Sequence, residues 1–427
     1  MVNRFFAPEV EWPRDKPRRI YALLADDDDE KLLFEAVDAD WFDDVGEIRA
    51  GSLRLWREFA SGAPLYVLET PASALEPEGV SPGRRDRWVE IEIHAGSGEG
   101  LLYNNLFAAP TTTSFRIASV SHRKARALLR WFSLKPYVSS TTDISKALSN
   151  LRGPHVEWIG VYDVGQGSAN GLCDGSGMPL AYYDLGGAVL GNAGTFPSAL
   201  TGLCLTHTPP VILSHWDWDH WSSGSRFPQA QQMTWIVPYQ RLGAVHATFA
   251  ADVAANGRLL VWPPALRSVE VGQLTIEKCR HKGRNHSGLA GHVTGPKGEL
   301  PILLPGDARY SAIPSGHASY TSVVVPHHGA DMKLKATPVC PALPASRLAY
   351  SYGQNNCYGH PRQVTYANHS VNGWAHSAAG VPGSVDLHTC NRGGAGLGHV
   401  ALGWTGTARL PRQPCRQSIC KLQLIQS

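Results

Sequence analysis

Short runs of apolar residues, bounded by polar or turn-forming residues, recur along the chain and predict β-strands. In the first third of the chain these runs lie at residues 19–25, 64–69, 87–94 and 114–119. A helix is predicted to begin at the acidic run 26–29 and to continue through residues 30–34, because carboxylates favour a helix's first turn. Another helix is predicted around Arg123, Lys124, Arg126 and Arg130, whose basic side chains share one face. This region is therefore predicted to be α+β.

A boundary is predicted after this region. The chain has 427 residues, more than the roughly 250–300 that a single core usually reaches. A polar stretch at residues 139–143 and the sequence Arg152-Gly153-Pro154 are typical of a linker. We therefore expect an N-terminal domain over residues 1–155, a second domain over 156–411 and a C-terminal tail over 412–427.

Beyond the boundary the predicted strands are short and strongly apolar. Residues 156–164 predict one strand, and residues 180–185 predict its hairpin partner. Four further strands are predicted at residues 210–213, 234–237, 301–304 and 322–325. The strands at 210, 301 and 322 each lead into a histidine or an aspartate. Side chains that follow adjacent strands converge at one edge of a sheet, so a functional site is expected there.

Composition excludes some classes of protein. Apolar residues make up 43% and charged residues 18% of the chain, which predicts a globular protein rather than a disordered one. The net charge is only +3, so any basic binding surface has to be local. The basic face at 123–130 is either such a phosphate-contacting surface or an ordinary solvated face.

The N-terminus lacks the pattern of a secretory signal, and no apolar run has the roughly 18 residues that a membrane-spanning helix needs. We therefore expect a cytoplasmic protein without membrane contact. The eight cysteines include no Cys-x-x-Cys pair, which predicts reduced and mostly buried thiols. Cys415 and Cys420 are the pair for which a disulfide stays open.

The densest ionisable cluster directly follows the strand at 210–213, in the run His215-Trp216-Asp217-Trp218-Asp219-His220. In an extended segment His215, Asp217 and Asp219 project to one side, and the tryptophans project to the other. Such a concentration of charge beside a buried strand is costly unless it is compensated, and metal ions would compensate it. Asp-x-Asp alone would favour a polar loop with capping aspartates. With Asp307 and His327 at the ends of later strands, the pattern predicts a metal site that Asp307 bridges.

Five blocks of sequence carry a resemblance to a known family. They are Asp163-Val164-Gly165-Gln166-Gly167, Leu213-Ser214-His215-x-Asp217-x-Asp219-His220, Pro305-Gly306-Asp307, Pro326-His327-His328-Gly329 and Ser351-x-Gly353-x-x-Asn356-x-Tyr358-Gly359-His360-Pro361. Together, over roughly residues 156 to 405, they resemble the metallo-β-lactamase superfamily. The resemblance is closest to the soluble metallo-β-lactamase domain of bacterial competence DNA-uptake channel proteins.

The resemblance implies an α+β fold: an αββα metallo-β-lactamase sandwich preceded by the separate N-terminal α+β domain. It places His215 and Asp217 on one metal, Asp219, His220 and His327 on a second, and Asp307 on both. Asn285 or His286 would complete the first metal's shell, with His281 and His292 nearby. Trp221-Ser222-Ser223-Gly224 replaces the usual Gly-Gly, Ser168 replaces a frequent acidic residue and Ala330 replaces a frequent serine. These departures leave the substrate open, and the missing channel means that DNA transport is not implied.

The predicted function is metal-dependent hydrolysis of a phosphodiester, with nucleic acid or a nucleotide as the substrate. Two divalent ions about 3.5–4 Å apart lower the pKa of a bridging water and neutralise charge on the reacting phosphate. Zn²⁺ and Mn²⁺ are the expected ions, with Mg²⁺ possible, because Asp217 makes the first site rich in oxygen. The candidate catalytic residues are Asp219, His328 and His360. For His360 the alternative is a structural role in its Tyr-Gly-His-Pro turn.

Two other functions stay open. The same fold supports hydrolysis of esters, thioesters or lactones. The other is a non-catalytic module with a structural metal site, whose N-terminal domain binds a protein partner. The tryptophans at 216, 218 and 221 are candidates for stacking on bases, although core packing is the expected role of the first two.

Overall fold

The computed structural model describes residues 3–7, 19–27, 31–48, 62–74, 88–108, 111–121, 125–153, 155–316, 318–332, 336–374, 386–390 and 397–405. The chain forms two compact units. Unit 1 comprises Met1–Pro136 together with Arg241–Asn256, and unit 2 comprises Tyr137–Gln240 and Gly257–Ser427. The division thus falls before residue 137 rather than after residue 155. Ile144, Leu148 and Leu151 explain this, because they pack into the core of unit 2.

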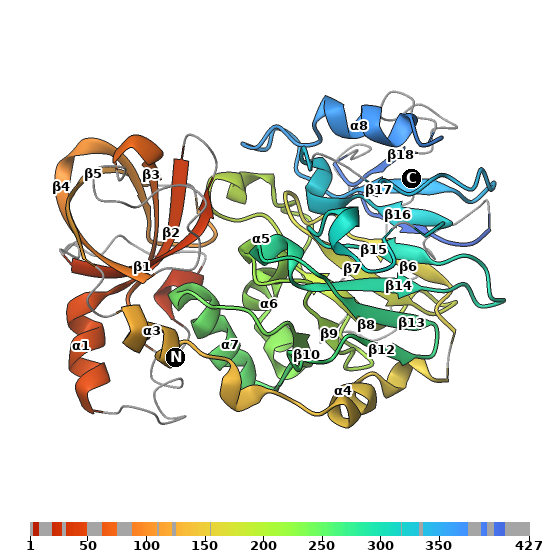
Figure 1. Ribbon diagram of the computed structural model, residues 1–427, viewed down its shortest axis with the longest axis horizontal. Coiled ribbons are helices and arrows are strands. Elements are labelled where there is room, and N and C mark those ends of the chain that lie inside the picture. Colours follow the sequence, from red (N-terminus) through yellow and green to blue (C-terminus); the bar gives the residue numbers. More distant parts are fainter. Residues whose placement is uncertain are drawn as a thin grey trace. The chain divides into compact units, whose positions relative to one another are not determined.

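Unit 1 is built around an antiparallel five-stranded sheet with the order β1-β2-β3-β4-β5. Its strands are β1 (Arg19–Asp27), β2 (Lys31–Asp38), β3 (Leu65–Pro71), β4 (Trp88–Tyr103) and β5 (Thr111–Ser121). Because β1 also pairs with β4, the first four strands close into a ring, drawn in red and orange in Figure 1. The helices of this unit are η1 (Arg4–Phe6), α1 (Ala39–Ile48), η2 (Ala72–Ala74), α3 (Ala125–Trp131) and α7 (Ala244–Asn256).

The four strands predicted in this region are confirmed, but the helix predicted at residues 30–34 is wrong. These residues belong to β2, which lies between β1 and β3 in the sheet. Alternate residues of β2, including Leu32 and Phe34, are buried in the core of the unit. Pairing on both sides and burial of one face therefore outweigh the local helical preference. Arg123 and Lys124 of the predicted basic face lie outside the described residues, whereas Arg130 is exposed on α3.

Unit 2 contains two seven-stranded sheets. The first has the order β11-β10-β9-β8-β7-β6-β19, with β6 (Trp158–Val161), β7 (Ala169–Cys173), β8 (Pro179–Leu185), β9 (Val211–Ile212), β10 (Thr234–Val237), β11 (Arg258–Val261) and β19 (Val400–Leu402). The second runs in sequence order, with β12 (Ser268–Val271), β13 (Leu274–Lys278), β14 (Leu289–Val293), β15 (Ile302–Leu304), β16 (Ser322–Val324), β17 (Arg347–Tyr350) and β18 (Asp386–His388).

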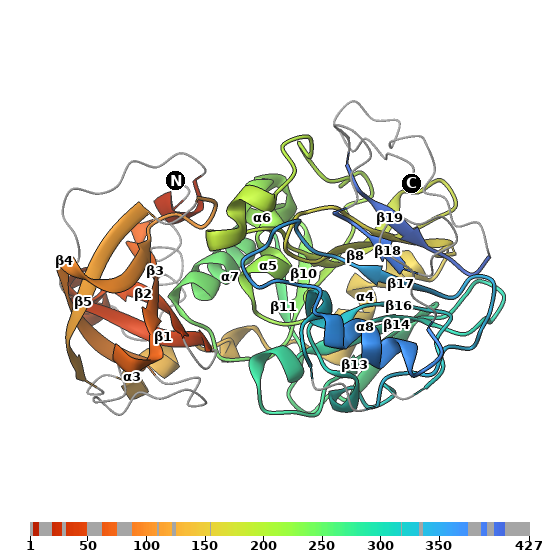
Figure 2. The ribbon, with the colours of Figure 1, turned by 90° about the horizontal axis from the view of Figure 1, so that it is seen from above.

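The two sheets share one apolar core, to which both contribute alternate side chains such as Val161 and Ile212 from the first and Ile276 and Leu304 from the second. Helix α8 (Gln363–Ser370) lies over the second sheet in both views (Figures 1 and 2). Its His369 accepts a hydrogen bond from Tyr310 within a separate cluster on that sheet's other face. The unit is therefore a mixed α+β structure with a two-sheet core.

Short helices connect these strands in unit 2. They are η4 (Lys135–Tyr137), which begins at the division, and then α4 (Thr141–Ala147), η5 (Ser149–Leu151), η6 (Leu190–Thr195), α5 (Trp218–Trp221), α6 (Ser223–Arg226), η7 (Pro228–Gln232), η8 (Arg284–His286), η9 (Tyr310–Ala312) and η10 (Pro326–Gly329).

The strands predicted at 210, 234, 301 and 322 are confirmed as β9, β10, β15 and β16. The predicted hairpin between 156–164 and 180–185 is wrong, because β7 lies between β6 and β8 and pairs with both. Strand β7, with the sequence Ala-Asn-Gly-Leu-Cys, has no run of large apolar residues and was therefore not predicted. Strands β15 and β16 are parallel, so Asp307 and His327, which follow them, lie at the same edge of the second sheet.

Within the described part of the chain, no helix combines the length and apolar character needed to cross a bilayer. The described cysteines, at 173, 204, 279, 340, 357 and 390, are all free thiols, and the first three are buried. Cys415 and Cys420 lie outside the described residues.

Candidate metal centre

The run His215-Trp216-Asp217-Trp218-Asp219-His220 changes conformation halfway along. His215 and Trp216 follow β9, and Asp217 then becomes the N-cap of helix α5, whose carboxylate accepts the Trp218 N–H at 2.7 Å. The predicted extended alternation therefore ends at Asp217, because a carboxylate at this position stabilises the start of a helix. Asp219 and His220 lie in the first turn of α5. His215, Asp219 and His220 belong to the cluster described next, whereas Asp217 belongs to neither of its two groups.

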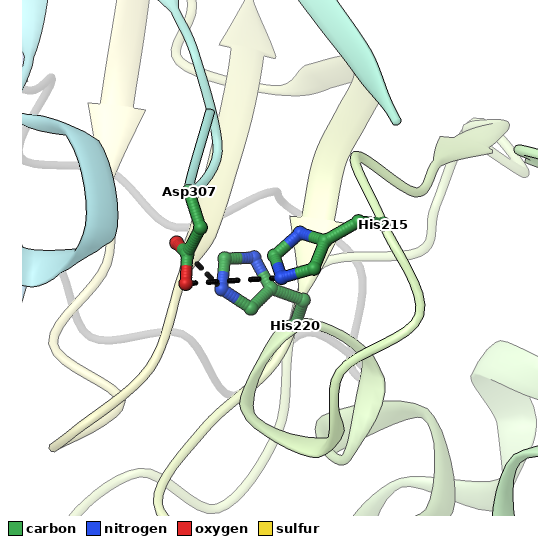
Figure 3. Close-up of side chains that lie close together, drawn as sticks. All are labelled: His215, His220 and Asp307. Carbon is green, nitrogen blue, oxygen red and sulfur yellow. Dashed lines mark ion pairs between the residues drawn. The ribbon is translucent and has the colours of Figure 1, made fainter. Parts of the chain in front are cut away.

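A first group of possible metal ligands consists of His215, His220 and Asp307, all of them buried (Figure 3). The Asp307 carboxylate lies beside the two imidazoles and faces the Nε2 atoms of both. Its Oδ1 is 3.0 Å from His220 Nε2, and its Oδ2 is 3.7 Å from His215 Nε2. Asp307 follows β15, whereas both histidines come from the loop and short helix after β9. The two sheets of unit 2 therefore each supply part of this group.

A second group consists of Asp219, His220 and His328. His328 Nε2 is 3.1 Å from Asp219 Oδ2 and 3.8 Å from Asp307 Oδ1, while His220 Nε2 is 3.7 Å from Asp219 Oδ1. His220 belongs to both groups, so they form one continuous cluster. His328 had been predicted only as a catalytic residue, and the structure adds it to the possible metal ligands.

Glycine and backbone contacts hold Asp219 in this place. The backbone N–H groups of Ser168 and Gly187 both donate to the Asp219 carbonyl, at 3.0 and 3.1 Å. Residues 186 and 187 run so close to α5 that a Cβ at Gly186 would overlap that same carbonyl oxygen. A larger residue at 186 would therefore push α5, with Asp219 and His220, away from the cluster.

The remaining predicted ligands lie at various distances from the cluster. His327 Nε2 is 3.4 Å from Asp307 Oδ2, although His327 belongs to neither group and is 30% exposed. Asn285 and His286 lie in η8, outside both groups. Asp307 and His327 both influence the pKa of His286, so this residue borders the cluster.

A buried carboxylate that the sequence analysis missed orients the imidazoles. Asp184, at the end of β8, accepts hydrogen bonds from the Ser214 N–H at 2.7 Å, the Ser214 hydroxyl at 2.9 Å and His220 Nδ1 at 2.8 Å. The Ser214 hydroxyl has one proton, which it donates to Asp184, so it accepts from His215 Nδ1 at 3.0 Å. Both imidazoles thus keep their Nδ1 protons and turn the Nε2 lone pairs towards Asp307. Asp184 follows an apolar strand, as Asp307 does, and that shared pattern was the available signal.

His328 is oriented in the same way. Its Nδ1 donates to the Ser351 carbonyl at 2.7 Å, which leaves the Nε2 lone pair facing Asp219. Donation from Nδ1 to an oxygen is the usual arrangement of a metal-binding histidine, because it fixes the ring and makes Nε2 a better ligand.

The atoms at the centre of the cluster have no hydrogen-bond partners among the described residues. They are His215 Nε2, His220 Nε2, His328 Nε2 and Asp307 Oδ1, each buried from solvent. An unsatisfied buried polar atom costs about 1–3 kcal/mol, so four in one place need an explanation. Divalent cations held by the two overlapping groups would satisfy these imidazole nitrogens and the carboxylate oxygen, and the residues present therefore fit such ions.

Electrostatics couple the members of the cluster. Burial lowers the pKa of His215 well below its ordinary value, and the neighbouring His220 adds to this. Burial would also lower the pKa of His220, but the carboxylates of Asp307, Asp184 and Asp219 raise it well above the usual range. Although burial would raise the pKa of Asp307, His220, His327 and His328 hold it well below the usual range. A cation would replace the positive charge that His220 otherwise supplies to these carboxylates.

His360 borders the same cluster from the loop after β17. Its ring centroid is 5.7 Å from that of His327, and its Nδ1 is 3.4 Å from Gln166 Nε2. Burial lowers the pKa of His360 to about 3, and His327 and His328 add to this. Because the Gln166 amide donates to Nδ1, neutral His360 carries its proton on Nε2.

The turn that contains His360 is held by another residue. The Asn356 amide donates to the His360 carbonyl at 2.7 Å, and its oxygen accepts the His360 N–H at 3.0 Å. Asn356 therefore contributes to fixing this turn, and the His360 ring also stacks on Tyr358 within it, with centroids 5.5 Å apart. Trp216, Trp218 and Trp221 are all buried, which agrees with the core packing expected for the first two and disfavours the stacking role considered for the third. Their surface is used in core packing.

No protein-family model matches this chain, and a comparison with curated proteins also finds no match.

Proposed function

We propose that unit 2 is a metal-dependent hydrolase of the metallo-β-lactamase fold that cleaves phosphodiesters. The observation that carries this proposal is the buried cluster of His215, His220, His328, Asp219 and Asp307, whose inward-facing nitrogen and oxygen atoms lack partners. Its support from the fold is the pair of seven-stranded sheets with the cluster at one edge. The five sequence blocks that resemble this superfamily all lie in unit 2.

The donor set favours particular ions. Three imidazoles with two carboxylates suit Zn²⁺ or Mn²⁺ better than Mg²⁺, which prefers oxygen ligands alone. Asp217 was expected to make the site richer in oxygen, but it lies in neither group of possible ligands, so Asp219 and Asp307 are the oxygen donors of these groups. When bound, one or two such ions would activate a water molecule and neutralise charge on the phosphoryl group.

The residues of the chain have separate tasks in this proposal. Asp184 and Ser214 hold His215 and His220 in one tautomer. Asp219 and Asp307 supply negative charge that draws cations into the cluster. His360 carries an N–H at Nε2 near the cluster, which suits a hydrogen bond to a phosphate oxygen or to the leaving group. Its low pKa means that it acts as a neutral hydrogen-bond donor at physiological pH.

One experiment separates this function from the alternatives. The metal-loaded protein is incubated with bis(p-nitrophenyl) phosphate, with a lactone, and with linear single- and double-stranded DNA, each beside the Asp307→Ala variant. We expect turnover of the diester by the wild type and at least about a 10³-fold lower rate for the variant. Lactone turnover without diester cleavage would instead assign the ester-hydrolase function.

Metal content decides the third alternative. Elemental analysis measures the number of metal ions bound per chain. If the wild type binds metal but hydrolyses none of these substrates, the centre is structural. Asp174→Asn is a suitable control, because Asp174 caps a turn at the end of β7 remote from Ser168 and the cluster. That variant should retain both metal and activity.

A further inference from the structure

A basic loop borders the metal centre. It connects β13 to β14 over residues 279–288 and contains Arg280, His281 and Lys282, which are exposed, followed by Arg284 and His286. The net charge of the whole chain is only +3, so this loop is a local concentration of positive charge. Such a concentration of charge is either a solvated surface or an anion-binding site. The contacts that hold the loop in place distinguish these two possibilities.

The loop is fixed to the segment that carries His215. Gln240 accepts the Trp216 N–H at 2.9 Å and donates to the Arg284 carbonyl at 2.7 Å and to the Ser287 hydroxyl at 2.9 Å. The Leu289 N–H donates to the Ser214 carbonyl at 2.7 Å. These bonds hold the loop in register with the metal cluster rather than leaving it to move in solvent.

The other side of the loop contacts the segment after Asp307. The Arg280 N–H donates to the Ala312 carbonyl at 2.7 Å, and the Arg309 guanidinium contacts His281 Nε2. Arg309 is two residues beyond Asp307, and its buried Nε has no hydrogen-bond partner among the described residues. The positively charged guanidinium of Arg309 therefore lies next to the cluster, and part of its hydrogen-bonding capacity is unused.

The contact between Arg309 and His281 positions the guanidinium. Because a guanidinium has donors only, Arg309 donates to the Nε2 lone pair of neutral His281. Other N–H groups of Arg309, Nε among them, are left for an oxygen of an anion beside this pair. Among the described residues no carboxylate forms an ion pair with Arg280, Lys282 or Arg309, so none supplies this oxygen.

We propose that Arg309 and His281, with Arg280 and Lys282, form an anion-binding subsite for a second phosphate of the substrate, the neighbour of the phosphate that is hydrolysed. This inference rests on the proposed phosphodiesterase function. It makes the chain selective for substrates that carry more than one phosphate. A nucleic acid strand and a nucleotide with several phosphates share this chemistry.

The test compares a substrate with one phosphate to a substrate with several. The metal-loaded full chain and its variants are assayed with bis(p-nitrophenyl) phosphate and with a short single-stranded oligonucleotide. Binding of the same fluorescently labelled oligonucleotide is followed by anisotropy over a range of salt concentrations. The variants are Arg280→Ala, Lys282→Ala and Arg309→Gln.

Lys297→Ala is the matched control. Lys297 is also exposed, but it lies in the turn from β14 to β15, at the end of these strands remote from Ser214 and Asp307. Substitution there removes the same charge from the same unit. We expect kcat/KM for both substrates to stay unchanged, apart from the small effect of net charge.

We expect each subsite variant to lower kcat/KM for the oligonucleotide roughly 5- to 10-fold and to leave the single diester within about twofold. The slope of log affinity against log salt should become shallower by roughly 0.7 for each phosphate contact removed. Competition by a nucleoside diphosphate, as effective per phosphate as an unlabelled oligonucleotide, would assign the subsite to nucleotides; weak competition would assign it to strands.

Two results would overturn the inference. Equal losses on both substrates would mean that these residues only support the metal centre. No loss on the oligonucleotide, and an unchanged salt slope, would mean that the loop is a solvated surface. If the wild type hydrolyses neither substrate, the proposed function fails separately, and the anisotropy of the variants still decides whether the subsite exists.

Discussion

Two buried imidazole–carboxylate clusters, one in each unit, differ in how completely the protein satisfies them. In unit 1, Glu35 of β2 lies 3.0 Å from His246 Nε2 and accepts the backbone N–H groups of Val245 and His246 at the start of α7. In unit 2, His220 and Asp307 also lie 3.0 Å apart, yet both facing atoms lack hydrogen-bond geometry and partners.

The comparison shows how a structural cluster is told from a functional one. Glu35 uses both carboxylate oxygens on groups of the protein, so nothing further is needed to hold α7 to the sheet. The cluster in unit 2 contains several imidazoles whose outer nitrogens are engaged and whose inner nitrogens are not. Burial alone does not separate the two cases, because all these side chains are buried. The two cases are distinguished by the inner nitrogen atoms, which lack hydrogen-bond partners in unit 2.

The largest effect is expected from Asp307→Asn, which keeps the shape of the side chain but removes its charge. Diester turnover should fall by at least about 10³-fold, because Asp307 belongs to the fully buried group of ligands and its carboxylate faces both His215 and His220. The variant should also lose the rise in Tm that metal gives the wild type. Turnover assays and thermal unfolding with and without Zn²⁺ or Mn²⁺ measure both effects. Turnover within tenfold of the wild type would mean that the cluster is not the reaction centre.

In unit 1 the corresponding change should affect stability instead. Glu35→Ala leaves buried His246 and the first N–H groups of α7 unpaired, so the free energy of unfolding of this unit should fall by about 3–5 kcal/mol. Lys31→Ala, which removes an exposed ion pair with Glu69 from the same sheet, should cost about 1 kcal/mol or less. Urea unfolding of both variants measures the difference. Similar losses from the two would mean that the buried pair holds nothing together.

Asp184 connects the two kinds of cluster, because it is fully paired itself and yet acts on the metal ligands. Asp184→Asn should weaken metal binding about 10- to 100-fold, since an amide cannot accept from both Ser214 and His220 in the same way. Metal titration of the variant beside Asp174→Asn measures the change. Equal affinities for wild type and Asp184→Asn would show that ring orientation does not depend on this carboxylate.

The sequence predicted the members of the metal cluster better than their arrangement. His215, Asp219, His220 and Asp307 were expected because charged residues after apolar strands need compensation, and the structure brings them together. Asp217 lies in neither group of possible ligands. The expected two-residue alternation assumes extended backbone, whereas the helix that Asp217 caps begins at the next residue.

Other errors arose where tertiary contacts decide the outcome. Residues 31–34 form a strand because β1 and β3 pair with it on both sides, which no local pattern records. Helix α7 belongs with unit 1 although it lies between β10 and β11 of unit 2 in sequence. Glu35, whose carboxylate accepts hydrogen bonds from the start of α7, lies more than two hundred residues away along the chain. Periodicity within a short window carries no information about such a partner.

A third imidazole–carboxylate pair tests whether partial exposure gives an intermediate result. Glu277 of β13 lies 3.3 Å from His292 Nε2 and accepts the N–H and hydroxyl of Ser315, at 3.1 and 2.8 Å. The contact with His292 and the hydrogen bonds from Ser315 lower the pKa of Glu277 to about 2, from an ordinary value of 4.5.

The lowered pKa of Glu277 sets the direction of a pH effect. The ionised carboxylate stabilises the folded state above the unfolded pKa of 4.5, and this contribution is lost as pH falls from there towards 2. Because the side chain keeps some contact with solvent, the loss should be about 1 kcal/mol. Unfolding free energies of wild type and Glu277→Gln, measured by urea between pH 2 and 7, should therefore converge as the solution becomes acidic. If the two curves of unfolding free energy against pH stay parallel, ionised Glu277 is stabilised no more by its partners than by water. Only complete burial would then make such a pair contribute to stability.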